Sequence, residues 1–540
     1  MMEVILEEIK NRPISISQWI LGFIGIFFVR YIFESLSSPT TLGIIPSDPY
    51  TLIHVGLFFL TTVLGLICVI GYWSKDYAGA QKVILFGLPV IWLAPILDII
   101  ISFGHGYRMT YIFDTSSALI FDFLTFFGPR LTHGATYGIR IEIIIILLLI
   151  GWYVWLVRKN LFHSLLAVLS SYILIFSLAA IPGFVYTLSH LNTGAGDFSE
   201  VLNYLVKIIS QSNIAHNTLH DGNSFVSGAR LFELGFDKFL SQILFILSFI
   251  FTAILFWKME PKKTLAVIKN SRPERVAFYI LLLLFGAGLA YANGYGNLNS
   301  WVDVMSLLTL VLSWYGAWMY AVHVNDVADI EIDKISNTTR PLVSGALTKE
   351  EMNQAGYVWL AVSLVGSWSV GFYPFFMNLV YVATSYIYSS PPLRLRRVPV
   401  LSSFLISLAC LVTVLTGFFF ISADKKIETF PIFTALGVLI VFTLITNIRD
   451  LKDTAGDRAN GVQTLATFFG KNAGKVIGLC FAVGILLVPI FLSFYILYLT
   501  AIPTAIMGYG IIVKKPFTEK NVFILGFLFF LSAIIMAMFI

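Results

Sequence analysis

Charged residues are scarce in this chain. Asp, Glu, Lys and Arg make up 12% of its 540 residues, whereas they make up about 25% of an ordinary soluble domain. Low-complexity tracts are missing too, and no stretch has the composition of a soluble domain. The shortage of charge excludes a soluble globular protein. The apolar run that begins at Gln18 lacks the small-residue cleavage signature of a signal peptide, so we expect a retained helix there.

Cysteine is rarer still. The three cysteines, Cys68, Cys410 and Cys480, each lie alone within an apolar run. Their positions offer neither a disulfide framework nor a metal-ligand spacing. We expect three buried free thiols.

Apolar residues are abundant. They account for 58% of the chain, and they recur in runs of about 20 residues, each long enough to cross roughly 30 Å of hydrocarbon. About fifteen such runs follow one another along the sequence. We therefore expect an all-α, polytopic membrane protein with about fifteen transmembrane helices.

A basic linker divides the chain. The segment from Lys258 to Arg275 reads KMEPKKTLAVIKNSRPER. We expect an N-terminal membrane domain of unknown role at residues 1–258 and a second membrane domain at residues 265–540. The expected spans of the first are 17–37, 51–73, 83–103, 139–157, 162–188 and 239–257. Those of the second are 277–293, 303–323, 355–373, 374–389, 399–421, 430–447, 475–491, 492–512 and 521–540.

Lys and Arg are distributed unevenly between the connections of the second domain. Those on one side of the membrane carry 20 of them, counting the linker, and those on the other side carry only Lys425 and Lys426. Short cytoplasmic loops carry the excess of positive charge in membrane proteins. We expect a cell-membrane protein whose N-terminus is cytoplasmic and whose C-terminus lies outside.

Two aspartate clusters with the same internal spacing interrupt the apolar pattern. One follows the second span of the second domain and the other follows the sixth, so both are expected on the cytoplasmic face. Each places carboxylates at positions i, i+3 and i+7, which form one stripe on a helix. The residues are Asn325, Asp326, Asp329 and Asp333 in the first cluster and Asp450, Asp453 and Asp457 in the second. Six carboxylates repel one another at membrane depth, and Mg²⁺ carrying a diphosphate is a common partner that makes this arrangement favourable.

Cationic residues occur in the same loops. They are Lys334, Arg340, Arg394, Arg396, Arg397, Arg449 and Lys452. Arginine grips phosphate oxygens with two parallel hydrogen bonds, so the loops suit a diphosphate leaving group. The Phe, Tyr and Trp content of the spans could form a pocket that protects an allylic carbocation from water.

Four motifs in order resemble the UbiA superfamily of intramembrane prenyltransferases. NDVADIEIDKISNTTRPLVSGALT (325–348) resembles its first aspartate motif, and DLKDTAGDRANGVQTL (450–465) resembles its second. Ser271-Arg272-Pro273 resembles the entry to its first helix, and YSSPPLRLRR (388–397) resembles its tyrosine-plus-basic segment. The resemblance covers about residues 265–540 and implies a barrel of nine transmembrane helices around a central cavity.

The resemblance also implies a reaction, in which a prenyl group passes from an Mg²⁺-bound prenyl diphosphate to a lipid or aromatic acceptor and pyrophosphate is released. It assigns all seven residues of the two clusters to metal and diphosphate binding, with Asp326, Asp329, Asp450 and Asp453 as the catalytic carboxylates. The diphosphate-binding candidates are Lys334, Arg340, Tyr388, Arg394, Arg396 and Lys452. Many members have Lys four residues after the tyrosine, where this chain has Pro392, so the basic role passes to Arg394 or Arg396.

Other interpretations stay open. A membrane carrier or binding protein for a phosphorylated isoprenoid or a metal would also use acidic clusters at helix ends. A carrier would be expected to hold its charges near the bilayer midplane, whereas both clusters lie on one face, which favours an enzyme. An ether-lipid precursor and an aromatic quinone precursor are comparable as acceptors. No nucleic-acid partner is expected, and the oligomeric state is open.

Ionisable residues also lie within or beside the spans of the first domain, where they are functional candidates by default. They are Arg30, Glu34, Asp98, Arg140 and Glu142, and outer loops add His105, Arg108, Arg130, His133, His190, His216 and His220. His216 and His220 are spaced i, i+4 before Asp221, which could chelate a metal ion, and Arg30 with Glu34 could be only an intrahelical pair. Our hypothesis is an outward-open pocket for a lipid headgroup or another polar ligand, separate from the prenyl-transfer cavity.

Overall fold

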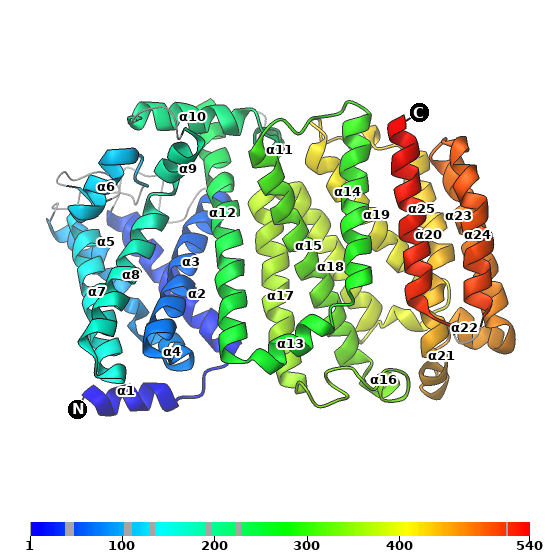
Figure 1. Cartoon of the computed structure of the whole chain (residues 1–540), viewed down its shortest axis with the longest axis horizontal. Helices are drawn as coiled ribbons and strands as arrows, with labels where there is room; N and C mark the ends of the chain where they lie inside the picture. The colour runs from blue at the N-terminus through cyan, green and yellow to red at the C-terminus, as the bar shows by residue number, and fades with distance from the viewer. Residues whose placement is uncertain are drawn as a thin grey trace. The chain divides into compact units, whose positions relative to one another are not determined.

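The long apolar runs fold into helices. The computed structural model describes residues 2–37, 48–101, 111–128, 135–190, 196–221, 228–514 and 517–539, and these contain helices but no strand (Figure 1). Helices are expected because hydrocarbon offers no hydrogen-bond partner to the backbone, so each segment must satisfy its own polar groups. The expected all-α membrane protein is confirmed.

The chain forms two compact units. The first comprises Met1–Thr218, Phe225–Pro261 and Ser300–Ser306, and the second comprises Leu219–Ser224, Lys262–Asn299 and Leu307–Ile540. The main division falls within the basic linker. The short segment Ser300–Ser306 belongs to the first unit although it opens a helix, α15 (Trp301–Ala328), whose remainder lies in the second.

Thirteen helices in the described residues are long and apolar enough to cross a membrane. Six of these spans end at or before Met259, and seven begin at or after Pro273. The two other expected spans are the helices α17 (Lys349–Val370) and α18 (Phe372–Ser389), which are not among these thirteen. Their polar groups satisfy each other inside the protein: Ser363 donates to Asn378 Oδ1 at 2.5 Å, and Asn378 donates to Ser313 at 3.0 Å.

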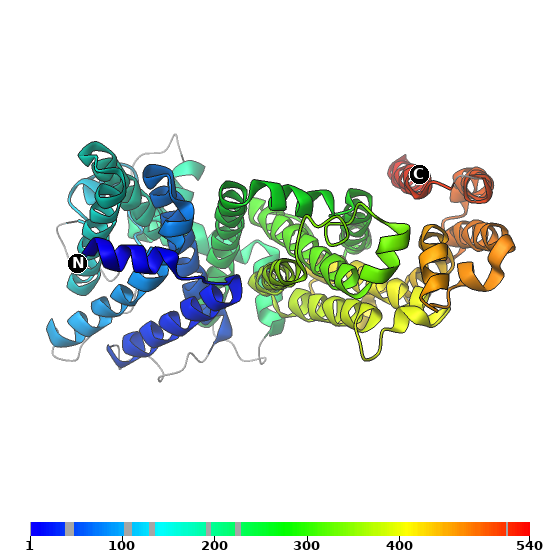
Figure 2. The same cartoon turned by 90° about the horizontal axis from the view of Figure 1, so that it is seen from below.

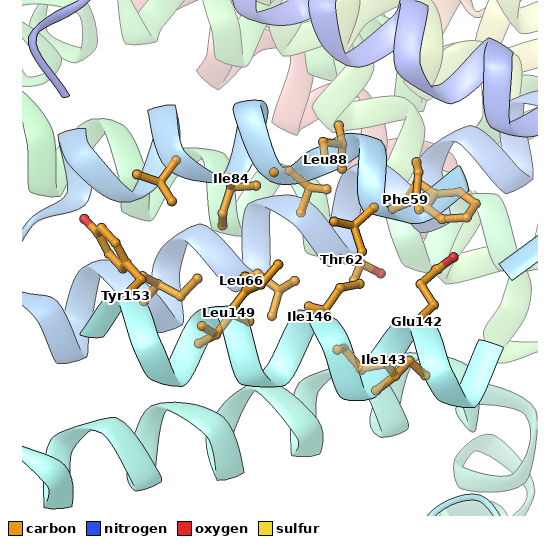
Figure 3. Close-up of a pocket in the computed structure, with 18 of the residues that line it drawn as sticks. Phe59, Thr62, Leu66, Ile84, Leu88, Glu142, Ile143, Ile146, Leu149 and Tyr153 are labelled. Carbon is orange, nitrogen blue, oxygen red and sulfur yellow. The ribbon is translucent and has the colours of Figure 1, made fainter. Parts of the chain in front are cut away.

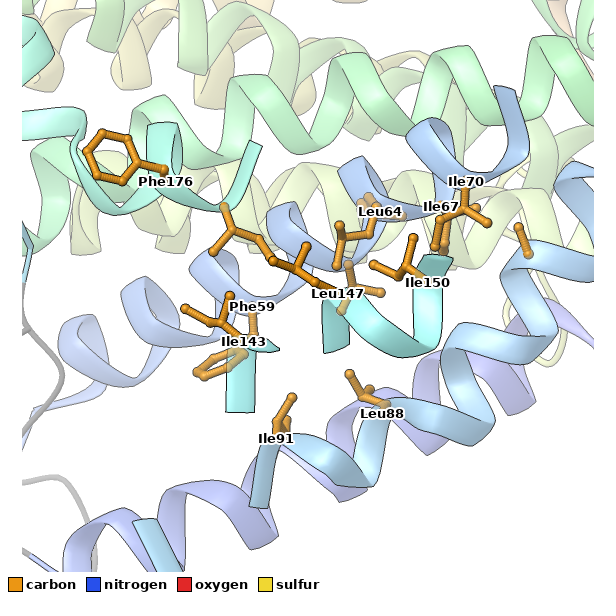
Figure 4. Close-up of a cluster of buried hydrophobic side chains, with 14 of the residues drawn as sticks. Phe59, Leu64, Ile67, Ile70, Leu88, Ile91, Ile143, Leu147, Ile150 and Phe176 are labelled. Atoms are coloured by element: carbon orange, nitrogen blue, oxygen red, sulfur yellow. The ribbon is translucent and has the colours of Figure 1, made fainter. Parts of the chain in front are cut away.

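The first unit is built around helix α3 (Pro49–Ser74), which packs against α4, α7, α8 and α12. The bounds of its other principal helices are α1 (Met2–Asn11), α2 (Ile16–Ser37), α4 (Tyr77–Gly87), η1 (Leu88–Trp92), α5 (Leu93–Ile101), α7 (Tyr137–Arg158), α8 (Leu161–Ala179), α9 (Ile181–Ser189), α10 (Phe198–Ser210), α11 (Asn213–Asp221) and α12 (Gly228–Met259). Aliphatic side chains from α3 and α7 face each other in its core (Figure 4). Figure 4 labels Phe59, Leu64, Ile67 and Ile70 of α3 and Ile143, Leu147 and Ile150 of α7.

The second unit contains nine long helices within the described residues. They are α14 (Pro273–Ala292), α15, α17, α18, α19 (Leu401–Ile421), α20 (Ile432–Ile445), α23 (Ala473–Phe491), α24 (Tyr498–Val513) and α25 (Glu519–Phe539). Small residues allow close helix packing, as is common in membranes: a Cβ added to Gly286 of α14 or Gly417 of α19 would meet the facing backbone within 2 Å. Three short helices, α16 (Ile330–Ser336), α21 (Asp450–Ala459) and α22 (Leu465–Phe469), lie at one end of these long helices (Figures 1 and 2).

Candidate active site

Both aspartate clusters lie on helices at the same end of the second unit. Helix α15 ends at Ala328 and α16 begins at Ile330, and backbone hydrogen bonds still link Asp329 to Asn325 and Asp333 to Asp329. The i, i+3, i+7 stripe therefore survives a small break at Asp329. The second cluster begins α21, directly after the short helix η4 (Thr446–Arg449). Helices α16 and α21 pack against each other, which brings the two stripes together.

One cavity collects side chains from both clusters. Its acidic and amide lining consists of Asn325, Asp329, Asp333, Asn337, Asp450 and Asp453. Its cationic lining consists of Arg272, Arg275, Arg340, Arg396, Arg449 and Lys452. Aromatic and aliphatic side chains continue the wall, among them Tyr279, Trp318, Tyr381 and Tyr388. The cavity thus joins a charged region to an apolar one.

Asp326 lies just behind this wall and is almost fully buried. Its carboxylate accepts hydrogen bonds from Asn270 and from Arg272, both at 2.6 Å. Asn270 in turn accepts one from Arg340 at 2.9 Å. Sequence reasoning did not single out Asn270. The only signal in the sequence was its position directly before the Ser-Arg-Pro motif.

Arg396 connects the two clusters. It forms ion pairs with Asp329 of the first cluster and with Asp457 of the second, the latter at 3.2 Å. Arg394 also pairs with Asp329, at 2.9 Å, but it does not line the cavity. Of the two basic residues that the sequence left as alternatives, Arg396 is the one that reaches both clusters.

Asn337 is a second link that sequence reasoning missed. Its side-chain amide donates to Asp333 at 2.7 Å and to Asp453 at 3.0 Å. A signal was present, because Asn325, Asp329, Asp333 and Asn337 follow one another at intervals of four, so they share one helix face.

Tyr388 and Arg449 form a pair in the wall, with the guanidinium 3.4 Å from the phenol oxygen. Lys452 also lines the cavity but pairs with Glu519 at 2.8 Å, and Glu519 accepts from Arg275 at 2.5 Å. Lys334 is placed differently: it is exposed and pairs with Glu331 at 2.7 Å, outside the cavity. Of the six diphosphate-binding candidates, the structure thus brings Arg340, Tyr388, Arg396 and Lys452 to the cavity.

Burial leaves the charges of the site incompletely compensated. It raises the pKa of Asp333, and Asn337 only partly opposes this effect. Burial likewise lowers the pKa of Arg272 and of Arg394. Asp457 is fully buried, and its Oδ2 atom accepts no hydrogen bond within the described structure.

The donor set fits a hard divalent cation. Mg²⁺ prefers carboxylate and amide oxygens together with oxygens from phosphate or water, and the two clusters supply the protein share. Within the described residues, no three His, Cys, Asp or Glu side chains already converge closely enough to hold a metal ion alone. Oxygens from phosphate or water would complete the coordination.

The ionisable residues of the first unit have structural partners. Asp98 accepts hydrogen bonds from Thr136 and the Gly138 amide, at 2.6 and 2.8 Å. Arg140 donates to backbone carbonyls that precede its helix, including that of Gly128 at 2.8 Å. Arg30 pairs with Glu142 at 2.8 Å and lies 3.6 Å from Glu34. Asp98 and Arg140 thus stabilise local backbone in this unit.

The structure describes only some of the histidines and arginines expected in the outer loops of the first unit. His105, Arg108, Arg130 and His133 lie outside the described residues, as do the side chains of His220 and Asp221. His190 hydrogen-bonds to the carbonyl of Tyr186 at 3.0 Å. The metal site at His216 and His220 stays a prediction.

Comparisons with known proteins identify relatives of part of this chain. The model of the UbiA prenyltransferase family matches residues 281–534. Digeranylgeranylglyceryl phosphate synthase of Sulfolobus acidocaldarius is 30% identical over 224 residues, which cover 40% of this chain and 78% of that relative. The 2-acylphloroglucinol 4-prenyltransferase of Humulus lupulus is 29% identical over 225 residues, which cover 39% of this chain and 50% of the relative. A solved UbiA homologue from Archaeoglobus fulgidus, bound to GPP and Mg²⁺, is 19% identical with a TM-score of 0.39, covering 49% of this chain and 96% of its own.

Proposed function

Since the chain belongs to the UbiA prenyltransferase family, we propose that it uses Mg²⁺ to transfer a prenyl group from a prenyl diphosphate to an acceptor within the membrane. It is a multi-pass membrane prenyltransferase. The observation that carries the finer proposal is the single cavity lined by both aspartate clusters, by cationic side chains and by buried aromatic rings.

The charged end of the cavity suits the diphosphate. Asn325, Asp329 and Asp333 on one side and Asp450 and Asp453 on the other would hold the metal. When bound, Mg²⁺ would neutralise negative charge on the diphosphate and so stabilise it as a leaving group.

The basic side chains would bind the diphosphate directly. Arg396 and Arg340 can exchange their present carboxylate and amide partners for phosphate oxygens, because both guanidiniums already line the cavity. The Tyr388 oxygen accepts a hydrogen bond from Arg449 in the cavity wall, so its own hydrogen can be donated to the diphosphate. These groups would orient the carbon–oxygen bond that breaks.

The aromatic end suits the prenyl group. Tyr279, Trp318 and Tyr381 are buried, and the ring centroid of Tyr279 lies 5.3 Å from that of Trp318 and 5.4 Å from that of Tyr381. Their faces would stabilise positive charge that develops on the allylic carbon as the diphosphate leaves. Their packing also keeps water from this carbon until the acceptor attacks.

A glyceryl phosphate lipid is the acceptor class that the comparisons favour. The synthase from Sulfolobus acidocaldarius is matched over 78% of its length, so most of that enzyme has a counterpart in this chain. The aromatic acceptor is the second candidate.

The test is an assay of the purified full-length protein with geranylgeranyl diphosphate and Mg²⁺. Geranylgeranylglyceryl phosphate and an acylphloroglucinol serve as alternative acceptors, and pyrophosphate release and product mass are measured. Prenylation of the lipid alone is the expected result. Prenylation of the aromatic acceptor alone would identify the second candidate. Binding of the diphosphate without pyrophosphate release with either acceptor would support a carrier and overturn the proposal.

The site is proposed to face the cytoplasm. The asymmetry of Lys and Arg between the loops supports this orientation. In a variant without the native cysteines, Ala459→Cys should react with an impermeant thiol reagent only from the cytoplasmic side, and Ala423→Cys only from outside. Labelling with the sides reversed would invert the topology.

A further inference from the structure

The first unit contains a long apolar cavity of its own. It has a volume of about 360 Å³ and lies between α3, α4, η1 and α7 (Figure 3). Four residues of α7 mark its length: Glu142, Ile146, Leu149 and Tyr153. The first and last of them are 11 helix steps apart, or about 16 Å at 1.5 Å per step, with Glu142 and Tyr153 at opposite ends (Figure 3). The cavity therefore has the shape of a chain and not of a compact headgroup.

Nearly all of the wall between these ends is hydrocarbon. Helix α3 contributes Phe59, Thr62, Val63, Leu66 and Ile70, at the spacing of one helix face. Several of these side chains also belong to the buried core of the unit. A space of this size inside an otherwise packed core loses dispersion contacts unless a ligand fills it.

A buried ion pair closes one end. Arg30 and Glu142 are both more than nine-tenths buried, and they pair at 2.8 Å. Glu142 also accepts a hydrogen bond from the Ala94 amide at 2.9 Å, and the Arg30 guanidinium lies 5.3 Å from the ring centroid of Phe59. Glu34 lies 3.6 Å from the same guanidinium, so two carboxylates share one cation and this end does not attract an anion.

A series of hydrogen-bonded side chains, Asp237, His54 and Tyr111, leads to the same end of the cavity. Asp237 binds Nδ1 of His54 at 2.6 Å, and Nε2 of His54 lies 2.7 Å from the Tyr111 hydroxyl. A carboxylate only accepts, so Nδ1 carries a proton, and in the neutral imidazole Nε2 then accepts from Tyr111. Tyr111 lines the cavity and packs against Phe58. Its oxygen retains an acceptor lone pair, which a ligand O–H could fill.

The opposite end is also polar but compensated. Tyr153 donates to Asp76 at 3.3 Å, and Asp76 pairs with Lys10 at 2.6 Å. A diphosphate or phosphate at either end would bring negative charge to a carboxylate that already has its cation. The lining therefore selects against the charged substrate that the second unit is proposed to use.

We propose that this cavity binds a lipid with one long hydrocarbon chain and a neutral, hydrogen-donating end group, which donates to Tyr111. The ligand class is a long-chain alcohol such as a prenol. The site lies wholly within the first unit and is chemically distinct from the diphosphate site of the second.

Photolabelling of the full-length protein tests this proposal. The probe is a long-chain alcohol that carries a diazirine at mid-chain, and peptide mass spectrometry locates the label. The alcohol should label peptides of α3 and α7, and the phosphate ester of the same chain should label them much less. Ile146→Trp, which fills the middle of the cavity, should abolish this labelling. Leu148→Trp is the matched control, because Leu148 lies two residues away on α7 and is 67% exposed.

The Tyr111→Phe variant distinguishes a specific alcohol-binding site from non-specific occupation of the cavity by membrane lipid. It removes one oxygen and leaves the apolar wall unchanged, so the alcohol should lose its advantage over an alkane probe of the same length. Labelling that persists in Ile146→Trp would overturn the site. Equal labelling by the alkane and the alcohol in the unaltered protein would show occupation by bulk lipid only and overturn the specific ligand class.

Discussion

The two units both bury arginines beside carboxylates, but they use them differently. In the first unit Arg30 has one main carboxylate partner, Glu142, whose charge is further satisfied by a backbone amide. In the second unit Arg396 is shared between Asp329 and Asp457, and Asp457 still has an oxygen without a hydrogen bond. Glu34 also lies 3.6 Å from Arg30, so the first arrangement has two carboxylates for one cation and is closed to an anion. The second is open to a further charged ligand, because Arg272, Arg275 and Arg340 also line its cavity.

The difference shows which membrane-embedded charges indicate chemistry. Asp98 and Arg140 were also functional candidates in the sequence, and their partners in the structure include backbone amides and carbonyls of their own unit. Such partners cannot leave without unfolding a segment. The partners of Asp326 and Asp329 are side chains that can rotate, so a ligand can replace them. The exchangeability of the partner, rather than burial alone, distinguishes a candidate site.

The largest expected effect comes from removing a carboxylate of the open site. Asp450→Asn and Asp326→Asn each preserve side-chain volume but remove a negative charge. Asp450 lines the cavity and is proposed to hold the metal, whereas Asp326 holds the cavity residue Arg272 in place. Prenyl transfer should fall at least about 100-fold, equivalent to about 2.7 kcal/mol of transition-state stabilisation. Steady-state pyrophosphate release over a Mg²⁺ titration measures it, with thermal unfolding as the check on folding. Full turnover of both variants at low Mg²⁺ would show that these aspartates are not part of the active site.

A smaller loss should follow when the link between the clusters is weakened. Arg396→Lys keeps the charge, but an ammonium cannot present the planar fork that reaches Asp329 and Asp457 together. Transfer should fall about 10-fold, or about 1.4 kcal/mol, mainly through a higher KM for the diphosphate. Arg397→Lys is the matched control, because Arg397 is adjacent and exposed. Equal losses in both variants would mean that the bridge is not used.

The closed pair of the first unit should affect stability and not transfer. Arg30→Met leaves Glu142 buried without its cation, which should destabilise the first unit by about 3–5 kcal/mol. The double variant Arg30→Met/Glu142→Leu removes both charges and should recover most of this loss. Thermal unfolding and prenyl transfer are measured in both. If the well-folded double variant has no transfer activity, the two units share one active site and the comparison fails.

The spans were predictable because each one is a local property of composition. Within the described residues, all six expected spans of the first half and all nine of the second are largely helical, although 83–103 and 162–188 are each divided between consecutive helices. The stripe of Asp326, Asp329 and Asp333 was likewise readable, since helical spacing places these residues on one face. Local sequence therefore contained the fold class and the acidic half of the candidate site.

The partners of these residues were not predictable, since they come from distant segments. Asn337 reaches Asp453 across 116 positions, and Asn270 reaches Asp326 across 56. The spacing of residues along the sequence also does not show whether a cationic side chain in a loop faces the cavity or the solvent. Lys334 and Arg396 were therefore equal candidates for diphosphate binding in the sequence. The apolar cavity of the first unit left no motif, because a wall of Leu, Ile and Phe has the same composition as a closed core.

The smallest expected effect concerns Lys334, where the sequence and the structure suggest different roles. As a member of the first aspartate motif, Lys334 was predicted to bind the diphosphate, but it is 54% exposed and pairs with Glu331, which is 69% exposed. An exposed pair of this kind contributes about 0–1 kcal/mol. Lys334→Ala should therefore change both transfer and thermal stability little, less than about twofold in rate. Lys452→Ala is the comparison variant, because Lys452 lines the cavity. Removal of this lysine should raise the KM for the diphosphate. A larger loss in Lys334→Ala than in Lys452→Ala would show that the α16 segment turns toward the cavity when substrate binds.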